Sequence, residues 1–513
     1  MTMTKVRTAA LLGTLILAAP ASAETLREAL AKAYQANPTL TAQRAAQRAI
    51  DENVPIARAA GIPSVAANGD YVENILTPGS TSTSGSNNSF ADPARRGSAN
   101  TQLTVPLYQG GAVRNSVRAA ETRVDAGRAT LRGTESDLFT ATVAAYMDVI
   151  RDEAIVSLNQ QNVRVLDVNL QAGRDRFQVG DLTRTDVAQS EARLALARAQ
   201  LQSAQAQLIT SRENYIRIVG TPPVNLEQPP ALPNLPASTD VAVTAALRNN
   251  PSLIAAQRQR DATRYDVSVA RSNRLPKVNA VIGGNYYNYF GALGAGTSQR
   301  VGQSGTSGTA GLTFTLPIFQ GGRPAAQIRQ AQALQSEAIE NATAAERGVI
   351  AQARSAFATW QSSEQVIASS EIAVNANKLS LEGVRAEYSV GTRTILDILN
   401  AEQELLNSQV TLVTARRDAY VAGFALLASM GNAEARDLGL EGGPLYDPVA
   451  NYDRVRRNLN DFAGGVEPDS VATTTAGTPA QDATVTRPLD PMLDTPVDRS
   501  PALTTGAAAP TRQ

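Results

Sequence analysis

The sequence predicts a mostly α-helical chain of long antiparallel coiled-coil helices, with four β-strands that can join a membrane β-barrel only in an oligomer. Two observations predict this class: an internal duplication, and the same order of helices and alternating segments in each copy. The composition suits long helices, because aromatic residues make up only 4% of the chain while Ala, Gln and Arg are abundant. The 513 residues therefore form two copies of one unit rather than several unrelated domains.

The residue counts exclude several classes of chemistry. The chain has no Cys and no His, which removes disulfides, thiolate nucleophiles, the commonest general base and the commonest metal ligand. Lys and Arg together number 47, as do Asp and Glu, so the chain has no basic excess for binding nucleic acid. We therefore expect no enzymatic activity, no cofactor, no metal site and no nucleic-acid partner.

Residues 1–23 are typical of a secretory signal peptide. Lys5 and Arg7 precede a short apolar stretch, and Ala21–Ala23 has the form of an A-x-A cleavage site. A single membrane anchor is the alternative, but the apolar stretch is too short for one. Export from a bacterial cytoplasm leads to the periplasm, the outer membrane or beyond, where a chain that crosses a membrane does so as a β-barrel.

Self-similarity defines two repeats, 24–220 and 240–431. The segment Thr104–Gly111 recurs 211 residues later as Thr315–Gly322, and the same offset aligns the later turns and helices without a gap. The residues between the repeats, 221–239, are rich in Pro and predict an extended linker.

Each repeat is predicted to contain a first helix, two strands separated by a Gly/Ser/Thr-rich loop, a long helix and a last helix. Apolar residues at helical spacing predict the helices, alternation predicts the strands, and Pro63 and Pro276 end the first helices. In the first repeat the predicted ranges are 26–60, 65–72, a loop over 77–97, a second strand that leads into the Gln-Gly-Gly turn, 113–177 and 183–219. In the second repeat they are 240–274, 278–287, a loop over 291–308, a second strand, 325–388 and 394–430.

The lengths of these elements indicate how chains assemble. A helix of about 64 residues spans roughly 95 Å, so it needs neighbours along its whole length, as in a coiled coil. The strands have about 9–11 residues, the length of a tilted membrane-spanning strand. Four strands are too few to close a membrane barrel, whereas a dimer supplies eight strands and a trimer supplies twelve.

The C-terminal part of the chain differs in composition from the repeats. Residues 432–463 are predicted to be a periplasmic extension. Residues 464–513 contain no aromatic residue and are dominated by Pro, Thr, Ala and Asp. Such a segment buries too little apolar surface of its own to offset the entropy of ordering it, so we expect a disordered tail.

The chain resembles the TolC family of outer-membrane efflux and secretion channels over about residues 24–440. The resemblance rests on the two repeats, on the strand-exit motifs Pro106–Gly111 and Pro317–Gly322, and on the segment Tyr388–Asp397. It implies a homotrimer with one twelve-stranded barrel in outer-membrane lipid and an α-helical tunnel through the periplasm. It also implies a passive exit duct for small-molecule efflux or type I protein secretion, linked by a periplasmic adaptor to an inner-membrane pump or ABC exporter.

An alternative function is that of a periplasmic coiled-coil adaptor or structural protein without a barrel. The alternating segments distinguish the two, because an adaptor has no need of two hairpins with long Gly/Ser-rich loops. The residues alone do not reveal whether the cargo is a drug, a protein or a polysaccharide.

The resemblance also implies roles for residues at the closed tip of the tunnel. Tyr388 and Arg393 match the family's tyrosine and arginine, and Asp186 matches the carboxylate that they bind, which makes a gate network. Asp397 matches a ring of carboxylates at the pore entrance. Asn400 stands at the place of the family's second acidic ring, so we expect one carboxylate ring with three charges per trimer.

The same tip residues also fit helix capping, because both sites have the form Thr-x-x-Asp after a Val-Gly turn. Capping does not require the repeats to differ, yet Tyr388 and Arg393 replace Phe177 and Leu182 of the first repeat. A gate made by one of two similar hairpins does require such a difference, so we expect caps that also serve a gate. The predicted helix-tip turns contain Gly180, Thr183, Gly391 and Thr394.

Overall fold

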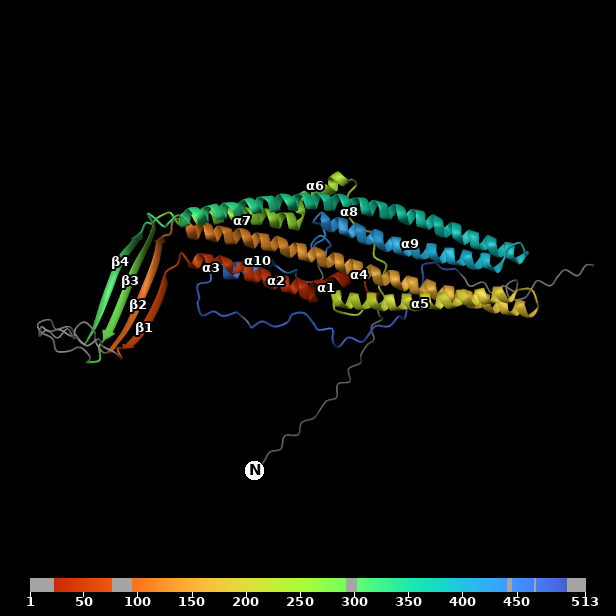
Figure 1. Ribbon diagram of the computed structural model, residues 1–513, viewed down its shortest axis with the longest axis horizontal. Helices are drawn as coiled ribbons and strands as arrows, with labels where there is room; N and C mark the ends of the chain where they lie inside the picture. Colours follow the sequence, from red (N-terminus) through yellow and green to blue (C-terminus); the bar gives the residue numbers. More distant parts are fainter. Residues whose placement is uncertain (1–22, 76–94, 292–301, 441–444, 466, 496–513) are drawn as a thin grey trace, which may run out of the picture.

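The protein is elongated, with a four-stranded sheet at one end and long helices that run from it to the opposite end (Figure 1). The computed structural model describes residues 23–75, 95–291, 302–440, 445–465 and 467–495. Residues 1–22 of the predicted signal peptide, parts of both predicted strand-to-strand loops and residues 496–513 of the predicted tail lie outside the described residues.

Four antiparallel strands form one sheet in the order β1-β2-β3-β4. They are β1 (Ser64–Glu73), β2 (Arg95–Tyr108), β3 (Lys277–Asn288) and β4 (Ser304–Thr315). Each repeat supplies one hairpin, and β2 of the first repeat pairs with β3 of the second. The predicted strands are therefore confirmed, and the two repeats join edge to edge in a single wall.

Side chains of opposite character point to the two faces of this sheet. Directly paired residues make one apolar row across all four strands, which consists of Val65, Leu103, Ile282 and Ala310. A polar row crosses the same strands on the other face, three residues after Val65 along β1. It consists of Asn68, Asn100, Asn285 and Ser307. Alternation of this kind is the pattern of a barrel wall that has lipid on one side and water on the other.

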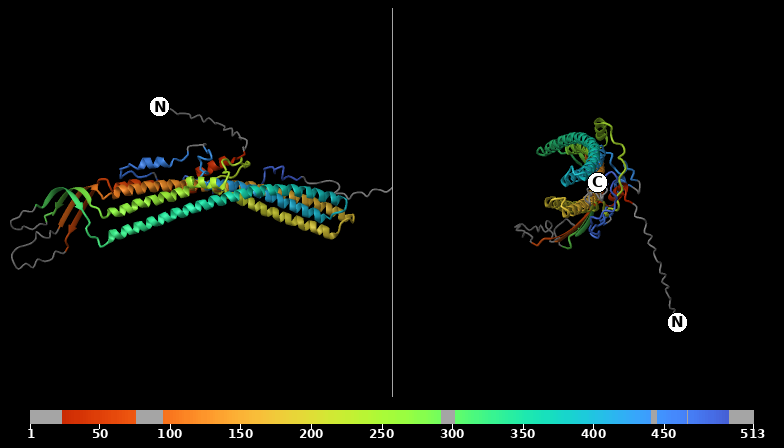
Figure 2. Two further views of the ribbon diagram at one scale, coloured as in Figure 1. Left: turned by 90° about the horizontal axis from the view of Figure 1, so that it is seen from above. Right: turned by 90° about the vertical axis from the view of Figure 1, so that its right-hand side faces the viewer.

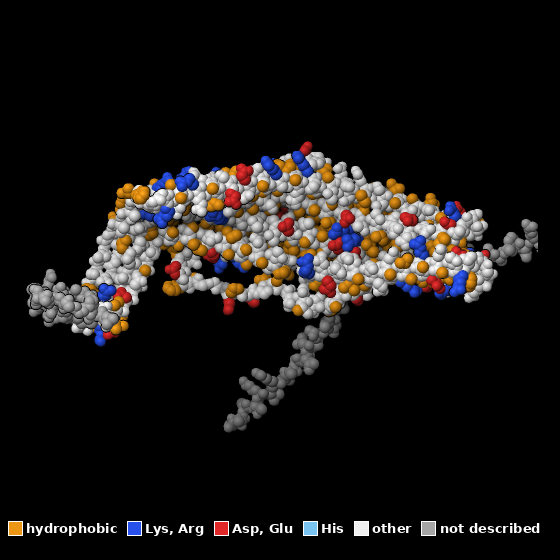
Figure 3. Space-filling view, viewed as in Figure 1, with side chains coloured by type: hydrophobic (Ala, Val, Ile, Leu, Met, Phe, Trp, Pro, Cys, Tyr) orange, Lys and Arg blue, Asp and Glu red, His pale blue; other side chains and the backbone are white. Residues whose placement is uncertain are grey.

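Both faces of the sheet are uncovered in the single chain, because the helices leave from its end rather than pack on it (Figure 2). Val65 is 70% exposed and Leu312 is 72% exposed. The ion pairs Arg95–Glu73 (3.2 Å) and Arg96–Asp70 (3.5 Å) lie at the end of the sheet away from the helices, where charged side chains are visible in Figure 3. The apolar row thus lies between this charged end of the sheet and the end from which the helices leave.

In the half of the molecule near the sheet, α7 (Pro251–Ser272) packs between two long helices (Figure 1). Two long helices and two return helices form most of the rest of the wall. They are α4 (Ala112–Gln178), α5 (Arg184–Val219), α8 (Arg323–Ser389) and α9 (Ile395–Ser429). The end-on view in Figure 2 shows the helices as an arc rather than as a solid bundle. Among the described residues, no helix combines the length and the apolar composition needed to cross a membrane.

The first helix of each repeat is interrupted, so the prediction of continuous helices over 26–60 and 240–274 is wrong. The first repeat contains α1 (Leu26–Ala36), α2 (Pro38–Asp51) and α3 (Asn53–Ala59), and the second contains α6 (Thr239–Asn249) and α7 (Pro251–Ser272). Asn37 and Asn250 are extended, with ψ of 126° and 120°. A residue before Pro is disfavoured in the helical region, so the chain breaks there and restarts with Pro as the first helical residue.

The two Asn residues also fasten the break to the end of the neighbouring helix. Asn37 Nδ2 donates to the Ile218 carbonyl at 2.9 Å, and Asn250 Nδ2 donates to the Ser429 carbonyl at 2.9 Å. Each side-chain oxygen in turn accepts from the first backbone N–H groups of the following helix. The Asn-Pro pair therefore sets both the break and its packing in each repeat.

We expect Asn250→Ala to destabilise the protein by about 1–2 kcal/mol, because it removes an N-cap and leaves a buried carbonyl without a partner. Thermal unfolding followed by circular dichroism measures this change. Asn407→Ala, on the exposed face of α9, is the control and should leave the midpoint nearly unchanged. Equal midpoints for the two variants would contradict the role given to Asn250.

The C-terminal part of the chain lies along the outside of the helices. The predicted extension contains α10 (Pro448–Val455), which packs against α2. The prediction of disorder from 464 onward is wrong for residues 482–495, since Leu493 is only 2% exposed and Arg212 Nη1 donates to the Asp482 carbonyl at 2.8 Å. The segment has no core of its own, but it gains one by docking on apolar surface that the helices supply.

Candidate functional site at the helix tips

Two tight turns form the end of the molecule opposite the sheet, one between α4 and α5 and one between α8 and α9 (Figure 1). Gly180 has a φ of +85° and Gly391 a φ of +84°, a conformation that side-chain-bearing residues rarely adopt. Gly180 N donates to the Phe177 carbonyl at 3.0 Å, and Gly391 N donates to the Tyr388 carbonyl at 3.0 Å. Both long helices therefore end in the same left-handed turn.

The return helices begin with matching caps. Thr183 N and Oγ1 donate to Asp186 Oδ2 at 3.0 and 2.7 Å. Thr394 N and Oγ1 donate to Asp397 Oδ2 at 2.9 and 2.8 Å. These hydrogen bonds hold the pKa of the Asp397 carboxyl below its usual range, with a smaller contribution from the Arg393 charge. Asp397 is consequently ionised at neutral pH and well below it.

Tyr388 joins the two hairpins at the tip through a residue that sequence analysis missed. Arg176 Nη1, in the last turn of α4, donates to the Tyr388 hydroxyl at 2.9 Å, and the guanidinium lies 5.0 Å from the centre of the ring. Both side chains are buried. Burial raises the pKa of the Tyr388 hydroxyl, and the Arg176 charge partly opposes that shift.

Within one protomer, the three residues of the predicted gate network do not bond to one another. Arg393 Nε forms an ion pair with Glu387 Oε2 at 2.7 Å, with half of each side chain exposed. Asp186 is engaged in its cap, although its charge acts on Tyr388 through space. Such an exposed ion pair contributes little by itself, because water and salt screen the two charges.

Asn400, at the second predicted ring position, also links the hairpins. Its Oδ1 accepts from Arg193 Nη2 of α5 at 2.8 Å, with Asn400 exposed and Arg193 partly buried. The amide thus provides a polar contact between α5 and α9 without adding a negative charge to the tip.

About two helical turns from the tip, a buried carboxylate ties α4 to α8 and α9. Asn169 Nδ2 donates to both oxygens of Glu402, at 3.0 and 3.1 Å, and Arg385 Nη2 donates to Glu402 Oε1 at 3.1 Å. Burial raises the pKa of Glu402, and the nearby Arg385 and the hydrogen bonds oppose this shift. Among the described residues, no cluster of acidic side chains has the composition of a metal site.

Arg176, Asn169 and Glu402 thus complete a set of contacts between hairpins that the sequence did not reveal. Their partners lie 212 and 233 residues away along the chain. The sequence contained one signal of these contacts, a carboxylate on the apolar stripe of a helix. Glu402 lies three residues from Leu399 and from Leu405, which are both buried.

Comparison with known proteins relates this architecture to one family. The family model described as outer membrane efflux protein matches residues 29–221 and 242–432, one match in each repeat. The outer membrane efflux protein BepC of Brucella suis biovar 1 (strain 1330) is 34% identical over 445 residues, which cover 86% of this chain and 93% of BepC. The outer membrane protein TolC of Escherichia coli (strain K12) is 28% identical over 477 residues, or 90% and 94% of the two chains.

Solved structures have the same fold. The outer membrane protein VceC of Vibrio cholerae superposes with a TM-score of 0.66 and 21% identity, over 79% of this chain and 96% of that one. The CmeC outer membrane channel of Campylobacter jejuni gives 0.69 and 15% identity, over 85% and 90%. Taken with the two repeats, the two-faced sheet and the paired helix tips, these matches show that the chain belongs to the outer membrane efflux protein family.

Proposed function

We propose that three copies of this chain form a passive exit duct in the bacterial outer membrane. The observation that carries the proposal is the apolar row and the polar row on opposite faces of the sheet. Within the described residues, β1 pairs only with β2 and β4 only with β3, so both outer edges are free to pair. Three sheets joined through these edges close a barrel of twelve strands, with apolar side chains toward lipid.

In this assembly the helical arcs continue the barrel wall as a tunnel through the periplasm, and the turns near Gly180 and Gly391 lie at its far end. The duct has no energy source of its own. An inner-membrane pump or ABC exporter, coupled through a periplasmic adaptor, would supply that energy. The family membership and the efflux named for BepC support export, while the relative named alkaline protease secretion protein AprF, of Pseudomonas aeruginosa, supports protein cargo as a second class.

The state of the purified protein tests this proposal. We expect the mature chain, of at most 54.0 kDa, to fractionate with outer membranes, to require detergent, and to run as a trimer that heating converts to monomer. A monomer that stays soluble without detergent would instead favour the periplasmic adaptor, although such an adaptor has no lipid for the apolar face of the sheet to contact.

The charge of Asp397 gives a further prediction about the tip. We expect Asp397→Asn to weaken block of the open channel by multivalent cations about tenfold or more, because three carboxylates leave the entrance while most cap contacts remain. Block is measured as the cation concentration that halves single-channel current. Asp186→Asn alters the equivalent cap and also removes a tip carboxylate, and it should weaken block less than Asp397→Asn because the entrance ring is assigned to Asp397.

The pH dependence of the block follows from the lowered pKa of Asp397. The carboxylate stays charged as pH falls through the usual Asp range near about 4, and block is lost only below it. Block that disappears between about pH 7 and pH 5 would contradict the assignment of this ring to Asp397.

A further inference from the structure

The last described residues of the chain lie in a groove between the two helical hairpins. We call residues 488–495 the clasp. They follow the matched family region by more than fifty residues, since that region ends at 432. Figure 1 shows this final stretch between α9 on one side and the α4/α5 pair on the other.

Main-chain carbonyls of the clasp accept hydrogen bonds from three helices. Lys378 Nζ of α8 donates to the Met492 carbonyl at 2.6 Å, and Gln409 Nε2 of α9 donates to the Leu493 carbonyl at 2.7 Å. Gln161 Nε2 of α4 donates to Asp494 Oδ1 at 3.1 Å and also to the Thr495 carbonyl. Donors directed at consecutive carbonyls are how a groove holds an extended peptide that lacks secondary structure of its own.

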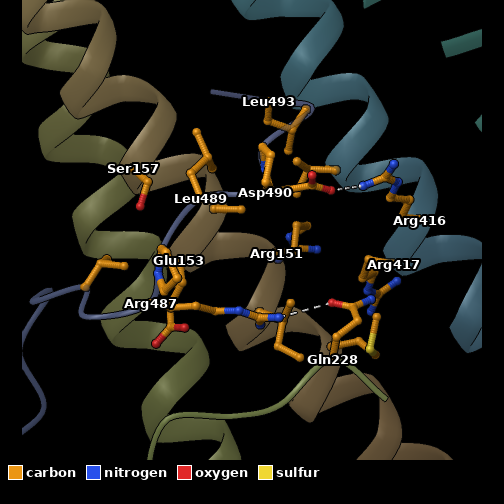
Figure 4. A pocket seen from close by; sticks show the side chains of 17 residues that line it. Arg151, Glu153, Ser157, Gln228, Arg416, Arg417, Arg487, Leu489, Asp490 and Leu493 are labelled. Atoms are coloured by element: carbon orange, nitrogen blue, oxygen red, sulfur yellow. Dashed lines mark hydrogen bonds and ion pairs between the residues drawn. The ribbon is translucent and has the colours of Figure 1, made fainter. Parts of the chain in front are cut away.

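Two side chains anchor the clasp. Leu493 is 2% exposed and belongs to the apolar cluster that also contains Leu158 of α4, Leu381 of α8 and Leu405 of α9. Asp490 Oδ2 pairs with Arg416 Nη1 of α9 at 2.7 Å (Figure 4). The clasp therefore contacts both hairpins at once, and it fills a position in their shared core.

Next to these anchors, the fit between segment and helices is open. A cavity of about 510 Å³ lies between residues 485–491 and the helices α4 and α9 (Figure 4). Its walls include Met147, Ile150 and Val413. The cavity is partly open to solvent, so this part of the segment is not packed into a closed core. The docked segment is thus held at a few points, which is the arrangement expected of a contact that can be released.

We propose that the groove between the hairpins is a docking site for an extended peptide segment, and that the clasp occupies it in cis to hold the hairpins together. Release of the clasp removes one set of contacts between α4/α5 and α8/α9, in addition to those of Tyr388 and Glu402, and so favours opening at the helix tips. The effect on opening rests on the proposed channel function, whereas the docking itself does not.

The absence of Cys from the chain makes the docking directly testable. In the full chain in outer membranes, Gln409→Cys with Thr495→Cys should form an intramolecular cross-link with a short thiol-reactive reagent, because Gln409 Nε2 lies 3.4 Å from Thr495 Oγ1. Asn407→Cys with Thr495→Cys is the matched control, since Asn407 is exposed two residues away on α9. Equal yields for both pairs, or cross-links only between chains, would overturn docking in cis.

Single-channel recording tests the consequence. Leu493→Asp should raise the frequency of openings at least tenfold, because a carboxylate is not tolerated in the apolar cluster, and the cross-linked Gln409/Thr495 pair should open less often than its uncross-linked form. Val471→Asp, at a 72% exposed position of the tail, should behave like the unaltered chain. Channels with unchanged opening in Leu493→Asp would overturn the clasp, whereas an unaltered chain without any channels would overturn the proposed function and leave the cross-linking result standing.

Discussion

Leu103→Arg is expected to prevent stable assembly of the protein in the outer membrane. Leu103 lies near the middle of β2, and its side chain joins the apolar row that crosses all four strands. An Arg on the lipid face near the bilayer midplane destabilises a barrel by about 2–4 kcal/mol, and a trimer carries three of them. The amount of heat-modifiable trimer in outer-membrane fractions measures the effect, and we expect a loss of at least tenfold.

Gln102→Arg provides a control only one residue away. Gln102 is paired with Ala66 and Gly283 on the opposite face of the sheet, which we assign to the water-filled lumen. The same substitution should therefore leave the amount of trimer nearly unchanged and alter only ion selectivity. Equal losses for the two variants, or normal assembly of Leu103→Arg, would contradict the assignment of faces.

Opening of the tip is the second large effect. Tyr388→Phe together with Arg393→Ser is expected to raise single-channel conductance several-fold, because it removes the Tyr388 hydroxyl that binds Arg176 and the Arg393 charge at the tip. In a trimer each change is made three times, so contacts that are weak singly act together. Planar-bilayer recordings of the purified variant and of the unaltered chain give the comparison.

Substitution of Arg176 distinguishes two sets of contacts that can hold the tip closed. If the bond between Arg176 and Tyr388 holds the hairpins, Arg176→Ser alone should reproduce most of the increase in conductance. If contacts between protomers through Arg393 dominate, Arg393→Ser alone should do so. Unchanged conductance in the double variant and in Arg176→Ser would show that these residues do not hold the tip closed.

Features that depend on local pattern were predictable from the sequence. The duplication, the alternating strands and the 67-residue helices α4 and α8 follow from periodicity and from turn residues such as Gly180 and Gly391. The caps at Thr183 and Thr394 follow from a four-residue pattern. The Asn-Pro breaks had a local signal as well, but helical periodicity on both sides of Pro38 concealed it.

Features that depend on distant partners were not predictable in the same way. The prediction of a disordered tail rested on its composition, which shows how little apolar surface the tail can bury against itself. Leu493 is instead buried against helices from elsewhere in the chain. The hydrogen bond between Arg176 and Tyr388 joins residues 212 positions apart, and nothing in either local sequence specifies it. The internal repeat located the tips, but only the packing of the two hairpins shows which side chains meet there.

Single-channel recording shows whether this chain forms a channel. Purified trimer added to a planar lipid bilayer should produce discrete conductance steps of uniform size, and an equal amount of Leu103→Arg should produce almost none. Absence of steps from the unaltered chain, or equal activity from Leu103→Arg, would contradict the assignment of the four-stranded sheet to a membrane-spanning barrel.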